Sequence, residues 1–286
     1  HPKYNEKILA SYDNIHFINP LDFDSRDSRC SAYIAYMICD KKENLKYAVL
    51  GSVADFYLLD IIKELSIKDP ESFNALFKMD DKYKKELFNF LDNNSFLDEE
   101  VFEERREFIQ GLWYDCDFVM FKFFFDTMYK LDDFRVALKT LKQIEKISFS
   151  EFRIELNEGK VGLFEKFAEI LEEYKKVYEN ISKKIEDEEF VYIEHGNCLI
   201  SYNRQLSEEF SYRLKKMDVL VSAYRKDDRD IVSGSIRSRK SDVTKLIKIG
   251  LEGLDGQGGG HVNAGGFIVK KKDFETFKSR LQAQFE

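Results

Sequence analysis

Glycine, arginine and histidine residues gather near the C-terminal end of the chain in a pattern suited to holding a phosphate group. A strand-like segment, Ser233–Arg239 (SGSIRSR), precedes Gly256–Gly266 (GQGGGHVNAGG). Consecutive glycines can turn several backbone amides toward one point, where they hold a phosphate without a side chain. A histidine can add a charge-assisted hydrogen bond, and arginines can fork onto phosphate oxygens. The alternative is a glycine-rich hairpin beside a surface arginine cluster.

A second candidate is Asp55, the single acid in the apolar run Tyr47–Leu59 (YAVLGSVADFYLL). Burying a carboxylate is costly unless it is paired or bound to a metal. Asp55 is therefore either a site residue or an acid on a helix surface. Of the histidines, His16 is interpreted as a packed strand residue and His195 as a turn residue.

Tyr202, Arg204 and Tyr224 could stack on the bases of a single strand. Packing in the core and at its rim is the simpler explanation for all three. Asp22 and Asp24 have the spacing of a metal-ligating pair, but a solvated loop accounts for them better.

Composition and patterning divide the chain into three regions, 1–66, 67–186 and 187–286. In the first, short apolar runs alternate with helical patterns, which is typical of an α/β core. A strand is predicted at 15–18 and a buried helix at 31–38. The middle region shows helical periodicity and almost no strand pattern. Its helices are predicted at 82–91, 99–108, 118–129, 134–147 and 161–185.

The last region has the pattern of a compact α+β domain. Strands are predicted at 190–193, 198–202, 219–224 and 231–236, and helices at 207–216, 242–249 and 273–283. Ser207 and Asp273 are residue types that commonly begin helices, because their side chains accept hydrogen bonds from the first free amides.

The 286-residue chain carries a net charge of −8, with 45 basic and 53 acidic residues. From Phe190 to the end there are 17 Lys/Arg and 13 Asp/Glu, so this part carries +4 and the remainder −12. No apolar run reaches the length of a membrane helix, so no membrane association is expected. The four cysteines lie far apart without a CxxC pair, which indicates reduced thiols and a cytoplasmic protein.

Several segments resemble one family. Gly258–Gly265 (GGGHVNAG) resembles the GGGHxxAAG signature of the DHH-associated C-terminal domain, and Ser235–Ser238 (SIRS) resembles the strand that precedes it. Leu50–Asp55 (LGSVAD) resembles the LGTVAD segment of RecJ-like phosphoesterases. His1-Pro2, with Ile15–Pro20 (IHFINP) after it, resembles the end of the DHH motif and the strand that comes next in the family. The sequence is identified as a DHH superfamily phosphoesterase of the archaeal RecJ-like branch, beginning inside the DHH motif.

The resemblance implies an α/β fold. Region 1–66 corresponds to the C-terminal portion of a DHH catalytic domain, 67–186 to a helical connector, and 187–286 to a DHH-associated substrate-binding domain. It also implies two bound Mn²⁺ or Mg²⁺ ions. Asp55 and His1 would be the catalytic and metal-binding residues of this chain. The implied phosphate-binding residues are Ser235, Arg237, Arg239, Gly258, Gly259, Gly260 and His261.

The implied function is that of a hydrolase, a nuclease that shortens single-stranded DNA or RNA from an end through metal-activated water, in DNA repair or replication. The family's other metal ligands precede its DHH motif, so we expect this chain alone to be inactive. One alternative is an inactive replication scaffold that uses the helical middle region to bind replication or repair proteins. Another is a phosphodiesterase of oligoribonucleotides or cyclic dinucleotides.

Overall fold

A computed structural model describes most of the C-terminal half of the chain and several helices of the N-terminal half. The described residues are 30–39, 44–54, 59–76, 118–130, 163–226 and 228–285, with single residues at 85, 89, 142, 146, 151 and 154. The described residues combine helices with a five-stranded sheet, which confirms the predicted α/β class. It divides into unit 1, His1–Phe125 with Ser148–Ser150, and unit 2, Asp126–Ile147 with Glu151–Glu286. The three regions 1–66, 67–186 and 187–286 stay a prediction.

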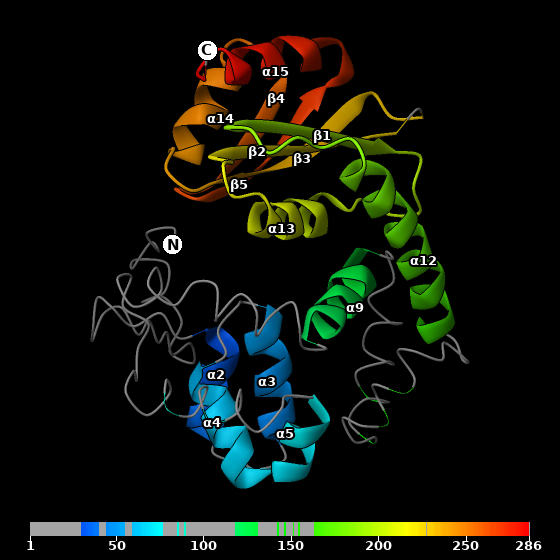
Figure 1. The fold of residues 1–286 in the computed structure, drawn as a ribbon, viewed down its shortest axis with the longest axis vertical. Coiled ribbons are helices and arrows are strands. Elements are labelled where there is room, and N and C mark those ends of the chain that lie inside the picture. Colours follow the sequence, from blue (N-terminus) through cyan, green and yellow to red (C-terminus); the bar gives the residue numbers. More distant parts are fainter. Residues whose placement is uncertain are drawn as a thin grey trace, which may run out of the picture. The chain divides into compact units, whose positions relative to one another are not determined.

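Unit 1 contains a group of short helices (Figure 1). They are α2 (Ser31–Cys39), α3 (Leu45–Ala54), α4 (Leu59–Lys68) and α5 (Pro70–Leu76). Helices α2 and α3 approach closely at Gly51. A Cβ atom added there would lie 2.3 Å from Cβ of Ala32, so the contact needs a residue without a side chain. The α5 helix begins at Pro70, and the preceding Asp69 accepts the Ser72 amide at 3.1 Å. The predicted helix at 31–38 is α2.

Helix α9 (Phe118–Lys130) confirms the helix predicted at 118–129. Phe123 and Phe124 are buried, as expected for this apolar stretch. The last turn of α9 belongs to unit 2. There the ammonium group of Lys130 donates to the Ser201 carbonyl at 2.6 Å and to Gln205 at 3.2 Å. The predicted strand at 15–18 and most residues of the helices predicted at 82–91, 99–108 and 134–147 lie outside the described residues.

Unit 2 is built around one five-stranded sheet of order β1-β2-β3-β5-β4. Its strands are β1 (Phe190–Gly196), β2 (Val219–Arg225), β3 (Ile231–Ser238), β4 (Gly256–His261) and β5 (Ala264–Lys270). Strands β1 and β2 are parallel, and the other pairs are antiparallel. The helices are α12 (Leu163–Ser182), α13 (Asn203–Arg213), α14 (Val243–Leu251) and α15 (Phe274–Gln282), with a 3₁₀ turn, η3 (Lys271–Asp273), before α15.

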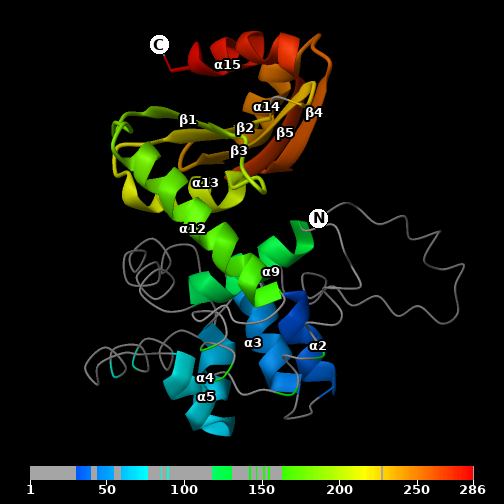
Figure 2. The ribbon, with the colours of Figure 1, turned by 90° about the vertical axis from the view of Figure 1, so that its right-hand side faces the viewer.

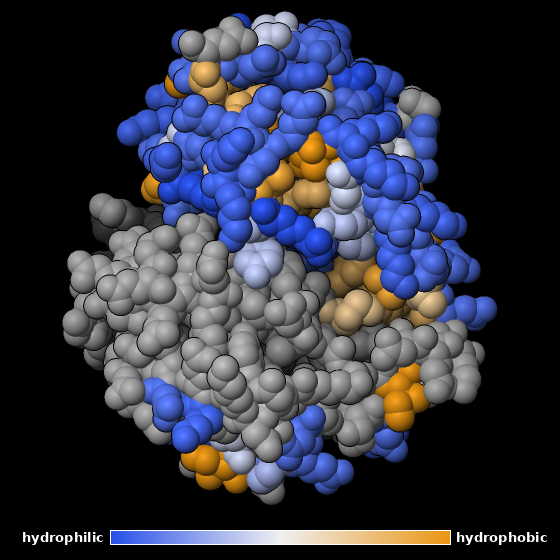
Figure 3. All heavy atoms as spheres, viewed as in Figure 1, coloured by the Kyte–Doolittle hydropathy of each residue, from blue (hydrophilic) through white to orange (hydrophobic). Residues whose placement is uncertain are grey.

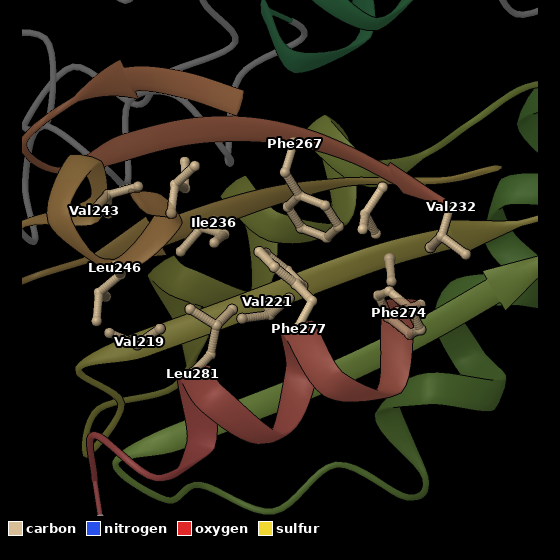
Figure 4. Packing of buried hydrophobic residues seen from close by; sticks show 13 residues of the cluster. Val219, Val221, Val232, Ile236, Val243, Leu246, Phe267, Phe274, Phe277 and Leu281 are labelled. Carbon is tan, nitrogen blue, oxygen red and sulfur yellow. The ribbon is translucent and has the colours of Figure 1, made fainter. Parts of the chain in front are cut away.

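The main core of unit 2 lies between the sheet and helices α14 and α15 (Figures 1 and 2). Phe267 of β5 meets Phe277 of α15, with ring centroids 4.5 Å apart (Figure 4). Val221 and Ile236 face the same helices from β2 and β3. Strand β3 alternates between buried and half-buried residues, since successive side chains point to opposite faces. One face of the sheet is therefore committed to this core.

Helix α13 lies on the opposite face, against β2 and β3. Helix α12 packs beside it: Tyr178 stacks on Phe210 at 4.9 Å, and the Tyr202 hydroxyl donates to the Ile170 carbonyl at 3.1 Å. Tyr202 also bonds Glu173 at 2.5 Å. These contacts hold the charged α12 against the rest of unit 2.

Two details of the predicted C-terminal elements are wrong. No strand forms at 198–202, because the chain bends after β1 at Asn197, which has a left-handed φ of 54°. Helix α13 begins at Asn203, so Ser207 lies inside the helix and bonds the Arg204 carbonyl.

The prediction at 242–249 is confirmed as α14, where Asp242 accepts the amides of Thr244 and Lys245. Asp273 precedes α15 as expected, but its side chain makes no capping bond.

The described surface of unit 2 is largely hydrophilic in the view of Figure 3, with small apolar areas. Among the residues that the structure describes, no helix is long and apolar enough to span a membrane.

His195 is a buried strand residue, not the turn residue that the sequence suggests. Its Nε2 atom accepts the Tyr202 amide at 3.0 Å, and the ring lies 5.2 Å from Tyr224. Burial, together with the charge of Lys130, lowers the pKa of His195 to about 4.

We therefore expect the protein to lose about 2 kcal/mol of stability between pH 7 and pH 5 through His195. In the unfolded chain the imidazole binds a proton near pH 6.5, whereas in the folded protein it does so only near pH 4, so acid favours unfolding. Urea denaturation of the wild type and of His195→Gln at both pH values measures this. A variant with the same loss between pH 7 and pH 5 would contradict the assignment.

Candidate phosphate-binding site

Three polar residues of β3 share the face of the sheet that carries α13. Ser233, Ser235 and Arg237 alternate with Val232 and Ile236, which enter the core. Because α13 packs on β2 and β3, the part of this face formed by β5 and β4 lies beyond the helix. The predicted site residues of β3 therefore border the part of the sheet that no described helix covers.

The strand register brings the two predicted motifs together on this face. Residues paired across antiparallel strands have side chains about 5 Å apart on one face. The rows from β3 through β5 to β4 are Arg237–Ala264–His261 and Ser235–Gly266–Gly259. Arg237 and His261 are thus two strand spacings apart, about 10 Å, with small residues between them. Two long polar side chains flank a floor that has almost no side chains.

The glycines of this hairpin divide into two groups by face. A Cβ atom on Gly258 would lie 2.7 Å from Ile247 of α14, and one on Gly265 would lie 2.6 Å from the same residue. A Cβ atom on Gly259 would meet nothing within 4 Å, and one on Gly266 only the Gly234 carbonyl at 3.5 Å. Packing therefore requires glycine at 258 and 265. The glycines at 259 and 266 instead leave space, among the described residues, on the face that carries Arg237 and His261.

The backbone of the glycine segment forms an edge strand of a hairpin, one of the two arrangements considered from the sequence. All residues of β4 are exposed, and β4 pairs only with β5 within the sheet. In such a strand some amides bond the neighbouring strand and others face the free edge. Gly260 has a φ of 155°, and its added Cβ would lie 2.3 Å from the Ala264 carbonyl oxygen. Only glycine fits this position.

Arg237 is held in place by α13. Its side chain is 18% exposed, and its guanidinium donates to the Ile236 carbonyl at 3.1 Å and lies 3.3 Å from the Glu208 carboxylate. Glu208 also accepts from Arg204 at 3.0 Å, and Arg204 lies 3.2 Å from Asp126. Sequence reasoning missed Glu208. Arg204 and Glu208 have i,i+4 spacing on α13, but the helix was predicted to begin at Ser207, so the sequence did not place both residues on one helix.

Arg239 has a different environment from Arg237. Its guanidinium donates to the carbonyls of Ser211 and Leu214, each at 2.6 Å, and of Lys215 at 2.8 Å, so it closes the end of α13. Its amide bonds the Asp218 carboxylate at 3.2 Å. The structure does not place Arg239 beside Arg237 on the uncovered face.

Asp218 fixes the chain where β3 ends. Its buried carboxylate accepts bonds from the hydroxyls of Ser238 and Ser241 and from the Lys240 amide. Burial alone would raise the pKa of Asp218, but the bonds from Ser241 and Lys240 outweigh it and lower the pKa below its ordinary value. This anchored turn sets where the polar face of β3 stops.

The other predicted residues either lie outside the described residues or are used in packing. His1 and Asp55 lie outside the described residues, as do His16, Asp22 and Asp24. Tyr202 and Tyr224 are buried and Arg204 is ion-paired, which agrees with the packing explanation. Within the described ranges, no cluster of three His, Cys, Asp or Glu side chains could hold a metal ion.

The C-terminal residues match a known family. The DHHA1 domain model matches residues 198–286. This part of the chain is therefore a DHHA1 domain, which confirms the sequence-based assignment to the DHH superfamily for these residues. No curated protein matches the chain.

Solved structures show weaker likeness. The pGpG-specific phosphodiesterase PggH from Vibrio cholerae is 11% identical, with a TM-score of 0.39, over 58% of each chain. RecJ from Thermus thermophilus in complex with Mn²⁺ is 11% identical, with a TM-score of 0.49, over 88% of this chain and 34% of that one. The C-Ala domain of Aquifex aeolicus alanyl-tRNA synthetase is 24% identical, with a TM-score of 0.29, over 35% and 96%. The chain thus spans little more than half of PggH and a third of RecJ.

The two groups of glycines predict opposite effects for neighbouring substitutions. Gly259→Ala should fold with nearly unchanged Tm, because its methyl group enters open space, and should weaken binding of a single-stranded oligonucleotide. Gly258→Ala should lose about 1–3 kcal/mol of stability, because its methyl group collides with Ile247. Thermal unfolding and fluorescence anisotropy measure the two effects. Equal loss of stability in both variants would contradict the division by face.

Proposed function

We propose that the protein is a DHH-family phosphodiesterase that shortens single-stranded nucleic acid from an end, and that its DHHA1 domain binds a substrate phosphate. The phosphate would lie over Gly259 and Gly266, beside the row that holds Arg237 and His261. The observation that carries this proposal is the open floor flanked by two side chains that can donate hydrogen bonds to an anion. Ser235, in the next row, offers a hydroxyl donor to the same position.

The charge of this part of the chain supports the same proposal. Residues 190–286 carry +4 within a protein of net charge −8. Arg237 is ordered before any ligand binds, because Glu208 and the Ile236 carbonyl hold its guanidinium. A preordered arginine loses little side-chain entropy when it binds a phosphate, which favours affinity.

The hydrolytic groups we propose are those of the N-terminal region. The carboxylate of Asp55 and the imidazole of His1 are ligand types that suit Mn²⁺ or Mg²⁺, and bound metal would supply an activated water for attack on phosphorus. The DHHA1 residues would then have one task, which is to hold the phosphate by Arg237, Ser235 and His261 and to orient the strand.

Replacing Arg237 tests the phosphate contact. Arg237→Ala should weaken binding of a single-stranded oligonucleotide about tenfold and reduce the slope of log K against log salt by about 0.7, because one phosphate contact is lost. Anisotropy titrations across a salt series measure both quantities. Lys248→Ala is the matched control, since it removes one positive charge from an exposed position on α14, across the sheet. An unchanged slope in Arg237→Ala would remove this residue from the site.

Replacing Asp55 tests the proposed chemistry. In the intact gene product with Mn²⁺, Asp55→Asn should abolish release of mononucleotides from a labelled strand while leaving strand binding within about twofold, because the variant loses a charged metal ligand. Comparing a dinucleotide with a long strand in the same assay separates a polymer nuclease from a small-substrate phosphodiesterase. Hydrolysis by Asp55→Asn at the parent rate would contradict the role of Asp55, and binding without hydrolysis by the parent would favour the scaffold.

A further inference from the structure

A hollow continues from the phosphate floor along the same face of the hairpin. Its lining includes Ser233, Gln257, Gly266 and Ile268. Ile268 is paired with Ser233 on one side and with Gln257 on the other, so these three residues form the next row of the face. The row Ser235–Gly266–Gly259 lies between this hollow and Arg237.

Ile268 is unusual in its position on β5. Its neighbours Phe267 and Val269 point into the core and are buried, whereas Ile268 points to the opposite face and is 38% exposed. Solitary exposed apolar residues are common on protein surfaces. This one lies in a hollow, between two polar side chains and next to a glycine floor. It offers a contact surface that the core does not use.

We propose that Ile268 and Gln257 form a nucleoside subsite that binds the base attached to the phosphate held by Arg237. This proposal rests on the proposed function. Two residues along an antiparallel strand span about 7 Å, so a phosphate over Gly259 lies one row from Ile268. That separation is within reach of the nucleoside attached to the same phosphate.

The two side chains offer complementary contacts to a base. The branched apolar side chain of Ile268 can lie against the face of a base and remove apolar surface from water. The amide of Gln257 carries one acceptor and two donor hydrogens, and paired bonds of this kind suit the N6 and N7 atoms of adenine. Gln257 is exposed on the edge strand, so it can turn toward a ligand without disturbing the core. The subsite therefore favours adenine-containing strands.

Oligonucleotides with and without bases test the subsite. The probes are an oligo(dA) strand and an abasic strand of the same length, which keeps the sugar and phosphates. Ile268→Ser and Gln257→Ala should each weaken oligo(dA) binding about three- to tenfold and leave abasic binding unchanged, because they remove base contacts alone. Arg237→Ala should weaken binding of both probes to the same extent. Thermal unfolding of each variant checks that it folds, and Lys248→Ala is again the control.

The outcomes separate the two proposals. If Arg237→Ala weakens both probes but Ile268→Ser and Gln257→Ala change neither, the nucleoside subsite is wrong and the phosphate site stands. If Arg237→Ala changes neither probe, the phosphate site itself is wrong. If Ile268→Ser weakens both probes equally, Ile268 acts on the backbone contact and not on the base. Equal effects of Gln257→Ala on oligo(dA) and oligo(dT) would overturn the preference for adenine.

Discussion

The rest of unit 2 depends on close packing at one face of the sheet. There α14 lies against β4 and β5, and the Phe267 ring of β5 lies against β3. A Cβ atom on Gly234 would lie 2.2 Å from the Phe267 ring, and Gly258 and Gly265 are equally restricted by Ile247. Interiors are packed as densely as organic crystals, so this face of β3, β5 and β4 can carry no side chains at these points. The glycine-rich sequence is thus first a requirement of the core.

The same constraint prepares the opposite face. Glycines in a strand leave a flat floor, and where no helix covers that floor it is open to a ligand. Within the described part of the chain, helix α13 packs on β2 and β3, and α12 contacts it through Tyr178 and Phe210. Among the described residues, Gly259 and Gly266 therefore have free space above them, in the row next to Arg237 and His261. Packing on one face and the proposed binding on the other use alternate residues of one hairpin.

Sequence reasoning located these elements well wherever a local pattern determined them. The helix predicted at 242–249 is α14, and the structure shows that the side chain of Asp242 bonds two amides of its first turn. The strand predicted at 198–202 failed because burial by α12, a distant segment, gives an apolar pattern without a ladder. The sequence suggests that Arg237 and Arg239 lie on the same face, because they are two residues apart in a strand-like segment. Strand β3 ends at Ser238, however, and Ser238 bonds Asp218 there, so Arg239 follows the strand. The division of the glycines by face needed the register of three strands.

The electrostatics of the site follow from a row of alternating charges. Asp126, Arg204, Glu208 and Arg237 are linked in that order by ion pairs of 3.0 to 3.3 Å. Because Glu208 is shared by two guanidinium groups, it neutralises neither fully, and Arg237 at the end of the row keeps attraction for a second anion. A phosphate over the glycine floor is the anion that we propose. The net charge of −8 does not oppose this, because the Debye length of about 8 Å at physiological salt confines the interaction to the nearest charges.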